Sequence, residues 1–229
     1  MIAVSAPCIA VANLEFHYEG QFTESEREKL EAWITEAEMG LESLVGVYPF
    51  DVKIRFSRVW SDTPVPFAST TRGRSQGIHF RVDPSYSLED FRQDWTAAHE
   101  LSHLVLPFVG QEQAWFAEGF ASYMQFQVMH AAGILSAEDA SNQYLARLKK
   151  AERDYNYPDE RFVDAAPKLR AERKYPVMYW GSSVFFVRLN HALRAEQGIT
   201  LIELLSRYVS CCRRKSSTVD DLIGRLDRL

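Results

Sequence analysis

Cysteine is scarce in this chain of 229 residues. Only Cys8, Cys211 and Cys212 occur, and none of them has the Cys-x-x-Cys spacing of a thiolate zinc site. Three unevenly placed cysteines are also too few for the disulfide framework of a small secreted domain. A bridge from Cys8 to Cys211 or to Cys212 stays open at this point, and free thiols are favoured over it.

Long apolar runs and an excess of basic residues are also absent. No stretch is long enough to cross a bilayer as a helix, so no integral membrane segment is predicted. The net charge is -5 and the basic residues are interleaved with acidic ones, so the composition gives no support to nucleic-acid binding. With 46% hydrophobic and 25% charged residues, the chain is typical of a folded globular protein.

The chain opens on an apolar segment, residues 1–12, which has no basic residues before it and is short for a complete signal peptide. We interpret this segment as a first strand that leads into residues 13–18. If it is instead the trimmed end of an export signal, the protein is periplasmic or secreted, and this address is slightly favoured over the cytoplasm. The sequence does not indicate an oligomeric state.

The first third of the chain has the pattern of strands with one helix. Residues 14–18 and 52–56 alternate apolar and polar side chains, as half-buried strands do, and residues 77–82 form a third such strand. A helical pattern begins after Thr23, between the first two strands. Residues 61–77 are rich in Pro, Ser, Thr and Gly and are interpreted as a loop.

From residue 88 onward the pattern is helical. Helices are predicted at 88–106, 113–131, 136–154, 178–196, 199–210 and 218–228, with an irregular connection at 155–176. Strands followed by helices predict an α+β fold. We expect a single domain over residues 1–229, with a β-rich lobe at 1–87 and a helical lobe at 88–229.

The strongest functional signal is the HExxH string at residues 99–103. Residues four apart lie on one face of a helix, so the imidazoles of His99 and His103 can bind the same metal ion. Glu100 lies beside that face, where it can take a proton from a water molecule without binding the metal itself. The flanking residues are apolar, and two histidines with a glutamate are costly there unless they are paired or bound to a metal.

Glu118 is the candidate third ligand. It is the lone acid in the aromatic and small-residue segment 115–123, where an unpaired carboxylate would be unfavourable. Pro107 and Gly110 allow a turn that brings the two helices side by side. Two imidazoles and one carboxylate leave a tetrahedral zinc ion one open position, as a catalytic site requires. If Glu118 is not the ligand, Glu112 is the nearest upstream acid.

These motifs resemble those of the gluzincin metallopeptidases, which carry HExxH on one helix and a glutamate ligand on the next. The string WFAEGFASY at residues 115–123 is similar to the corresponding stretch of the aminopeptidase N and glycyl aminopeptidase groups. The resemblance covers residues 77–131 and extends more weakly to about residue 210. It implies a thermolysin-like zincin fold, one zinc ion per chain, and hydrolysis of a peptide or protein substrate with Glu100 as the base.

The resemblance also implies an oxyanion donor and a substrate-binding strand. Tyr179 begins a segment similar to the tyrosine-plus-glycine helix start that these families place over the zinc, and its hydroxyl would stabilise the anionic intermediate. Tyr175 is the alternative donor, because the tyrosine-to-glycine spacing differs from that of the aminopeptidases. Residues 77–82 have the position of the edge strand that holds an extended substrate by strand addition.

The chain departs from the family pattern in three ways. The spacing from His103 to Glu118 is shorter than in the aminopeptidases and thermolysin. No Gly-x-Met-Glu-Asn segment, with which aminopeptidase N types hold a substrate's free amine, precedes the metal helix, so endopeptidase action is favoured. Ser122 stands where thermolysin-like enzymes have an aspartate that orients a metal histidine.

Two other functions stay open. One is a zincin-like metal-binding domain for recognition or scaffolding, although such a domain has no need for Glu100. The other is a metal-dependent hydrolase of a non-peptide amide, which would use the same activation of water. Arg170, Arg173 and Lys174 precede Tyr179 and would suit acidic substrates, but a solvated face is the favoured interpretation.

Overall fold

The computed structural model describes residues 13–73, 75–213 and 217–229. The expected first strand within residues 1–12 and a bridge from Cys8 therefore lie outside the described residues. Cys211 and Cys212, which are neighbours in the chain, are joined to each other by a disulfide, in place of the free thiols that the sequence favoured. Within the described ranges, no helix is long and apolar enough to span a membrane.

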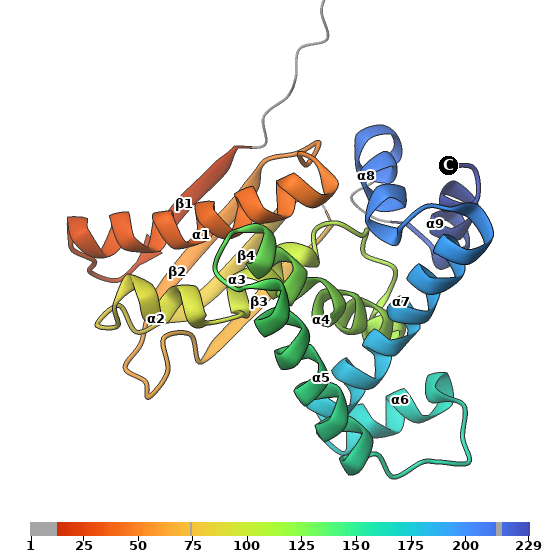
Figure 1. The fold of residues 1–229 in the computed structure, drawn as a ribbon. Helices are drawn as coiled ribbons and strands as arrows, with labels where there is room; N and C mark the ends of the chain where they lie inside the picture. Colours follow the sequence, from red (N-terminus) through yellow and green to blue (C-terminus); the bar gives the residue numbers. More distant parts are fainter. Residues whose placement is uncertain (1–12, 74, 214–216) are drawn as a thin grey trace, which may run out of the picture.

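A four-stranded sheet forms the first part of the molecule, in the order β1-β2-β4-β3 (Figure 1). The strands are β1 (Leu14–Glu19), β2 (Val52–Arg58), β3 (Phe67–Thr71) and β4 (Gln76–Val82). The first, second and fourth run parallel, and β3 pairs antiparallel with β4. The sheet is therefore mixed, as expected for the α+β class.

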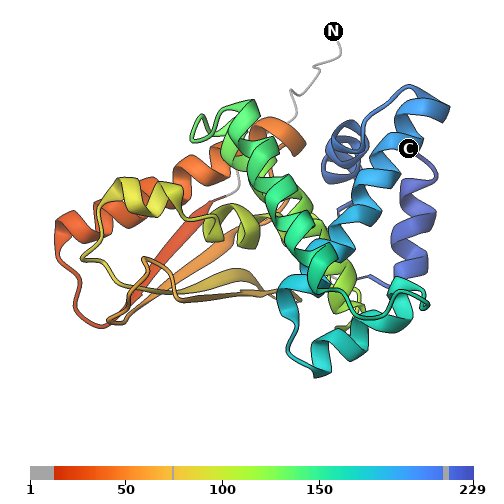
Figure 2. The ribbon, with the colours of Figure 1, turned by 60° about the horizontal axis from the view of Figure 1, so that its bottom comes forward.

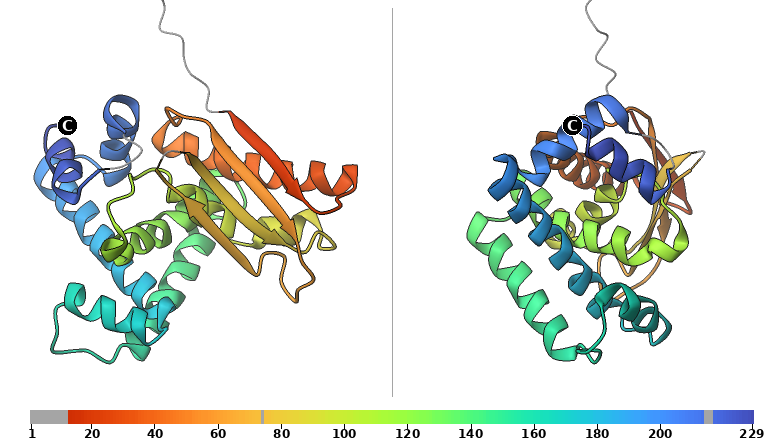
Figure 3. Two further views of the ribbon diagram at one scale, coloured as in Figure 1. Left: turned by 180° about the vertical axis from the view of Figure 1, so that it is seen from behind. Right: turned by 90° about the vertical axis from the view of Figure 1, so that its right-hand side faces the viewer.

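Helices cover only one face of this sheet. In β2, Val52, Ile54 and Phe56 are buried, whereas Lys53 and Arg55 between them are exposed, as the two-residue period of a strand requires. The buried face packs against α1 (Glu24–Val45), which begins with a capping box at Thr23. Figure 2 shows this helix on one side of the sheet, and the left view of Figure 3 shows the opposite face open.

The strand at 77–82 exists but does not lie at the edge of the sheet, so that prediction is wrong. As part of β4 it is hydrogen-bonded on both sides, to β2 and to β3. The edge strand is β3, which lies inside the segment 61–77 that was interpreted as a loop. It contains only Phe67 and Ala68 as apolar residues, and its pairing with β4 creates a strand that its own pattern does not predict.

The helix predicted at 88–106 is in fact two short helices. The first is α2 (Leu88–Gln93) and the second is α3 (Thr96–Ser102), with a break at Asp94 and Trp95. The Asp94 carboxylate accepts a hydrogen bond of 2.8 Å from the backbone N–H of Thr96. This contact satisfies a backbone donor at the start of α3.

The remaining helices form the second part of the molecule. They are α4 (Ala114–Ala131), preceded by the short 3₁₀ helix η1 (Gln111–Gln113), α5 (Ala137–Asp154), α6 (Phe162–Ala171), α7 (Tyr175–Gln197), α8 (Leu201–Cys212) and α9 (Val219–Leu226). The predicted irregular connection at 155–176 is therefore wrong in part, because α6 forms there despite Pro167. Ala166 and Leu169 of α6 are buried against Val177 and Met178 of α7, and this burial favours the helix.

Candidate active site

The helix α3 places the HExxH residues in a buried position. His99 is 3% exposed and His103 is 5% exposed. Two hydrogen bonds from distant residues fix the end of this helix: the Tyr48 hydroxyl donates to the Leu101 carbonyl at 2.6 Å, and the Arg213 guanidinium donates to the Leu104 carbonyl at 2.7 Å. These two contacts hold the backbone at the end of the helix that carries the imidazoles.

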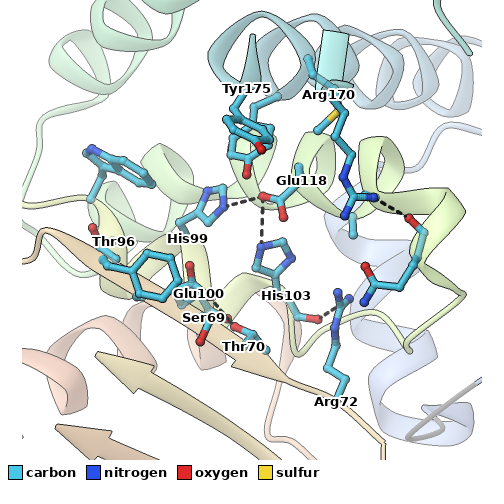
Figure 4. A pocket seen from close by; sticks show the side chains of 18 of the residues that line it. Ser69, Thr70, Arg72, Thr96, His99, Glu100, His103, Glu118, Arg170 and Tyr175 are labelled. Carbon is cyan, nitrogen blue, oxygen red and sulfur yellow. Dashed lines mark hydrogen bonds and ion pairs between the residues drawn. The ribbon is translucent and has the colours of Figure 1, made fainter. Parts of the chain in front are cut away.

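Glu118 reaches these imidazoles from the neighbouring helix α4. Its Oε2 atom lies 3.2 Å from Nε2 of His99 and 3.5 Å from Nε2 of His103 (Figure 4). The turn at residues 103–113 brings α4 alongside α3, as the sequence predicted from Pro107 and Gly110. The alternative acid, Glu112, is exposed on η1 and does not line the site.

The distances from Glu118 Oε2 to the two imidazole nitrogens are compatible with a zinc ion. Zinc bonds to histidine nitrogen and carboxylate oxygen are about 2.1 Å long, so the ligand atoms of a tetrahedral site lie roughly 3.4 Å apart. The two separations from Glu118 Oε2 agree with this value. The donor set of two imidazoles and one carboxylate is that of a catalytic zinc site with one position left open.

Two carboxylates lie close to the histidines, and their surroundings differ. Ligand atoms of His99, Glu100 and His103 lie within 4.8 Å of one another. The Glu100 carboxylate, however, accepts a 2.6 Å hydrogen bond from the hydroxyl of Thr70, whereas Glu118 contacts both imidazoles directly. Contact with both nitrogens favours Glu118 as the ligand and leaves Glu100 beside the site.

His99 is oriented by a residue that the sequence analysis missed. Its Nδ1 atom lies 2.9 Å from Oε1 of Gln125, which is buried on α4. An amide oxygen can only accept, so Nδ1 carries a proton, and Nε2 is the ring nitrogen that faces Glu118. Gln125, and not Ser122, is therefore the residue that orients the imidazole of His99. A usable signal was the spacing of seven residues from Glu118, which places both side chains on one face of a helix.

The charges in the site depend on one another. Burial alone would raise the pKa of the Glu118 carboxyl, but the imidazoles of His103 and His99 outweigh burial and hold the pKa well below its usual range. Burial alone would lower the pKa of His99, but its hydrogen bond and charge interaction with Glu118 raise the pKa instead. The carboxylate is thus ionised and ready to bind a cation.

Both candidate tyrosines come from α7 and line the same cleft as the histidines. The ring of Tyr179 stacks at 6.1 Å from that of His99, measured between ring centroids, and Tyr175 lies 6.3 Å from Tyr179. Burial, with the charges of Glu118 and Glu100, raises the pKa of Tyr179 far above its usual range. Tyr179 therefore stays protonated and able to donate.

The cleft has a volume of about 490 Å³ and two different walls. One wall is the edge strand β3, which contributes residues 67–70, and the other comprises α4, α6 and α7. The side chains of His99, His103 and Glu118 lie between these walls (Figure 4). Because β3 pairs with β4 on one side only, its other side can hydrogen-bond to an extended chain.

Comparison with known proteins supports the fold. No family model and no curated protein matches this chain. Among solved structures, it is similar to an aminopeptidase N family protein from Idiomarina loihiensis, with a TM-score of 0.66 and 15% sequence identity, and the match covers 93% of this chain. The chain spans 42% of the length of that protein. The likeness is one of fold, and it agrees with the predicted α+β class and with the resemblance to gluzincins in general.

Proposed function

We propose that this chain is a zinc-dependent metallopeptidase of the gluzincin type with a zincin fold. The observation that carries the proposal is the convergence of His99 Nε2 and His103 Nε2 on one oxygen of Glu118, at 3.2 and 3.5 Å. Glu100 lies beside this cluster at the floor of the cleft. A buried pair of histidines with an ionised carboxylate has the ligands and the spacing for one zinc ion per chain.

Each residue has a separate role in the proposed reaction. His99, His103 and Glu118 would hold the zinc ion, which would act as a Lewis acid and bring the pKa of a water molecule close to neutrality. The Glu100 carboxylate takes the proton of the attacking water and passes it to the leaving amine. The Tyr179 hydroxyl, from α7, donates a hydrogen bond to the oxygen of the anionic intermediate, with Tyr175 as the alternative donor.

The substrate would bind as an extended peptide along β3. The unpaired side of this edge strand faces the cleft, and added strands gain backbone hydrogen bonds that do not depend on sequence. The carboxylates that line the cleft are Glu100 and Glu118, and both have roles in the proposed chemistry. With no further described acid to hold a free amine there, endopeptidase action is favoured over aminopeptidase action.

Zinc content and proteolysis, measured on the same preparations, test the proposal. We expect one zinc ion per chain and cleavage of casein or of a peptide library. Glu100→Gln should keep the zinc and lose turnover, and Glu118→Ala should lower the zinc content. Glu112→Ala removes an exposed acid of the adjacent η1 and serves as the matched control, with zinc and activity unchanged.

Other results would favour the alternatives. Stoichiometric zinc with no cleavage of any peptide would indicate a recognition domain or a hydrolase of another amide. Equal activity of Glu100→Gln and the unmodified protein would exclude the role of Glu100 as base. Unchanged zinc content in Glu118→Ala would mean that the third ligand is another residue.

A further inference from the structure

The cleft contains two guanidinium groups that the proposed chemistry does not use. Arg72 follows the last residue of β3, and Arg170 lies near the end of α6, on the opposite wall. Both line the cleft that holds the histidines. In Figure 4 both lie on the same side of His103 and Glu118, away from Thr96.

Arg72 has little to bind within the protein. Arg72 makes a long contact of 3.5 Å from Nη1 to the His103 carbonyl and a cation–π contact over Phe108, with 5.7 Å between the guanidinium and the ring centroid. No described carboxylate forms an ion pair with it. Burial lowers the pKa of Arg72, while Glu118 and Glu100 oppose that effect, and a guanidinium remains charged in proteins. Most of its five N–H donors are therefore free for a ligand.

Arg170 differs from its basic neighbours. Lys168 and Lys174 form ion pairs with Glu160 and Glu172, both at short distances of 2.7 and 2.8 Å. Arg170 donates to the backbone carbonyl of Gln111 at 3.0 Å and has no carboxylate partner among the described residues. It thus brings an uncompensated positive charge to the wall of the cleft.

The acidic residues of the cleft would not neutralise the charges of Arg72 and Arg170 once zinc is bound. Glu118 would be neutralised by the ion and Glu100 is the proposed base, and no other described acid lines the cleft. A guanidinium presents paired N–H donors that match a carboxylate, and the charge-assisted hydrogen bonds are short and strong. The same charges would repel the free amine of a substrate.

We propose that Arg72 and Arg170 form a carboxylate-binding subsite, so that the cleft selects peptides with a carboxylate close to the scissile bond. The carboxylate comes from an acidic side chain or from the C-terminus of a short peptide. This inference rests on the proposed peptidase function and adds the substrate class to it. The solvated face that the sequence favoured is thereby replaced, for Arg170, by a role in the site.

Matched peptides separate the two sources of the carboxylate. One set is acetylated and amidated at its ends, and Glu or its isostere Gln is placed at each position around the cleaved bond. The other set is neutral and ends in either a free carboxylate or an amide. We expect one carboxylate position to raise kcat/KM by about tenfold, mainly through KM, and the preference to weaken at high salt.

Variants of the two arginines test the assignment. Arg170→Gln should remove most of the preference, and Arg170→Glu should reverse it in favour of Lys peptides. Because Arg170 is exposed, neither change disturbs the core. Arg72→Gln should also weaken the preference. Its zinc content is measured to show that the end of α3 is intact. Arg173→Gln removes an equal charge two residues beyond α6, outside the cleft, and should leave the preference unchanged.

The outcomes distinguish this inference from the proposed function. Equal cleavage of acidic and neutral peptides, or an unchanged preference in Arg170→Glu, would overturn the subsite while leaving the peptidase in place. If the protein cleaves no peptide, the proposed function fails, and binding of the same labelled peptides, followed by fluorescence anisotropy, decides the subsite. If the carboxylate peptides bind more tightly than the neutral ones and Arg170→Gln removes this difference, the result would still support the subsite. Equal binding of all peptides would refute the subsite.

Discussion

The hydroxyl of Thr70 donates a 2.6 Å hydrogen bond to Oε2 of Glu100, and its oxygen also lies 3.1 Å from the Glu100 carbonyl. Thr70 belongs to β3, so the strand proposed to hold the substrate also fixes the proposed base. The alternation of β3 turns Ala68 and Thr70 to the side of α3, whereas Phe67 and Ser69 face the other way. The strand β3 can therefore align both the bound peptide and the Glu100 carboxylate.

Thr70→Val should reduce kcat between about tenfold and a hundredfold, because a misplaced base costs rate even when its chemistry is intact. KM and zinc content should change little, since the variant keeps the shape of the side chain and touches no ligand. Thr70→Ser retains the hydroxyl and should recover most of the rate. Steady-state kinetics with zinc analysis checks these expectations, and an equal loss in the Ser and Val variants would contradict the positioning role.

Gln125 should control zinc affinity through His99. Gln125→Leu removes the oxygen that accepts the Nδ1 proton at 2.9 Å, so the imidazole loses its fixed tautomer and orientation. We expect zinc affinity to fall between about tenfold and a hundredfold, measured by competition with a chromophoric chelator. Gln125→Glu keeps an acceptor and should retain affinity, and Ser122→Ala should match the unmodified protein. A large loss in Ser122→Ala would assign the orienting role to Ser122 instead.

The placement of His99, His103 and Glu118 could be predicted because it follows from local sequence rules. His99 and His103 are four residues apart, and on a helix this spacing alone directs both imidazoles to one side. Glu118 was predicted as their partner because an unpaired acid among aromatic and small residues is costly, and its oxygen does contact both nitrogens.

The features that were missed depend on contacts between distant segments. The edge strand β3 is short, polar and preceded by Pro64 and Pro66, and it is extended because β4 pairs with it. The helix α6 forms around Pro167 because its apolar side packs on α7. Gln125 is an ordinary amide in the sequence, and it becomes important only when α3 lies against α4. Periodicity within one segment contains none of this information.

Glu38 on α1 should make stability depend on pH. It is 7% exposed, its Oε1 has no hydrogen-bond partner among the described residues, and burial, with a smaller effect of Glu42, raises its pKa to about 7. Since the ordinary value is 4.5, the folded state holds a proton that the unfolded chain releases between these two values. The free energy of unfolding should therefore fall as pH rises through this window and level off above about 7.

Glu38→Gln should remove this dependence. The variant and the unmodified protein should have equal stability near pH 4, where both side chains are neutral, and the variant should be more stable by about 3 kcal/mol at pH 8. Urea unfolding at the two pH values measures the difference. Glu28→Gln, on the exposed side of the same helix, is the control and should change stability equally at both. A gain for Glu38→Gln that is as large at pH 4 would contradict the linkage.

Gly119, the residue after the proposed ligand Glu118, should tolerate no side chain. A Cβ atom at this position would lie 2.3 Å from Cβ and 2.8 Å from the backbone carbon of Ser182, on α7. Gly119→Ala should therefore cost about 1–3 kcal/mol of stability and move α7, with Tyr179, away from the histidines. Adding Ser182→Gly removes the closer contact and should recover part of the loss, because the backbone contact remains.

Gly224→Ala, in α9, is the control. A Cβ atom there would have its nearest neighbour at 3.7 Å, so this change should instead stabilise the protein by up to about 1 kcal/mol. Thermal unfolding of the unmodified protein and the three variants measures these changes. Equal changes in stability for Gly119→Ala and Gly224→Ala would contradict this account.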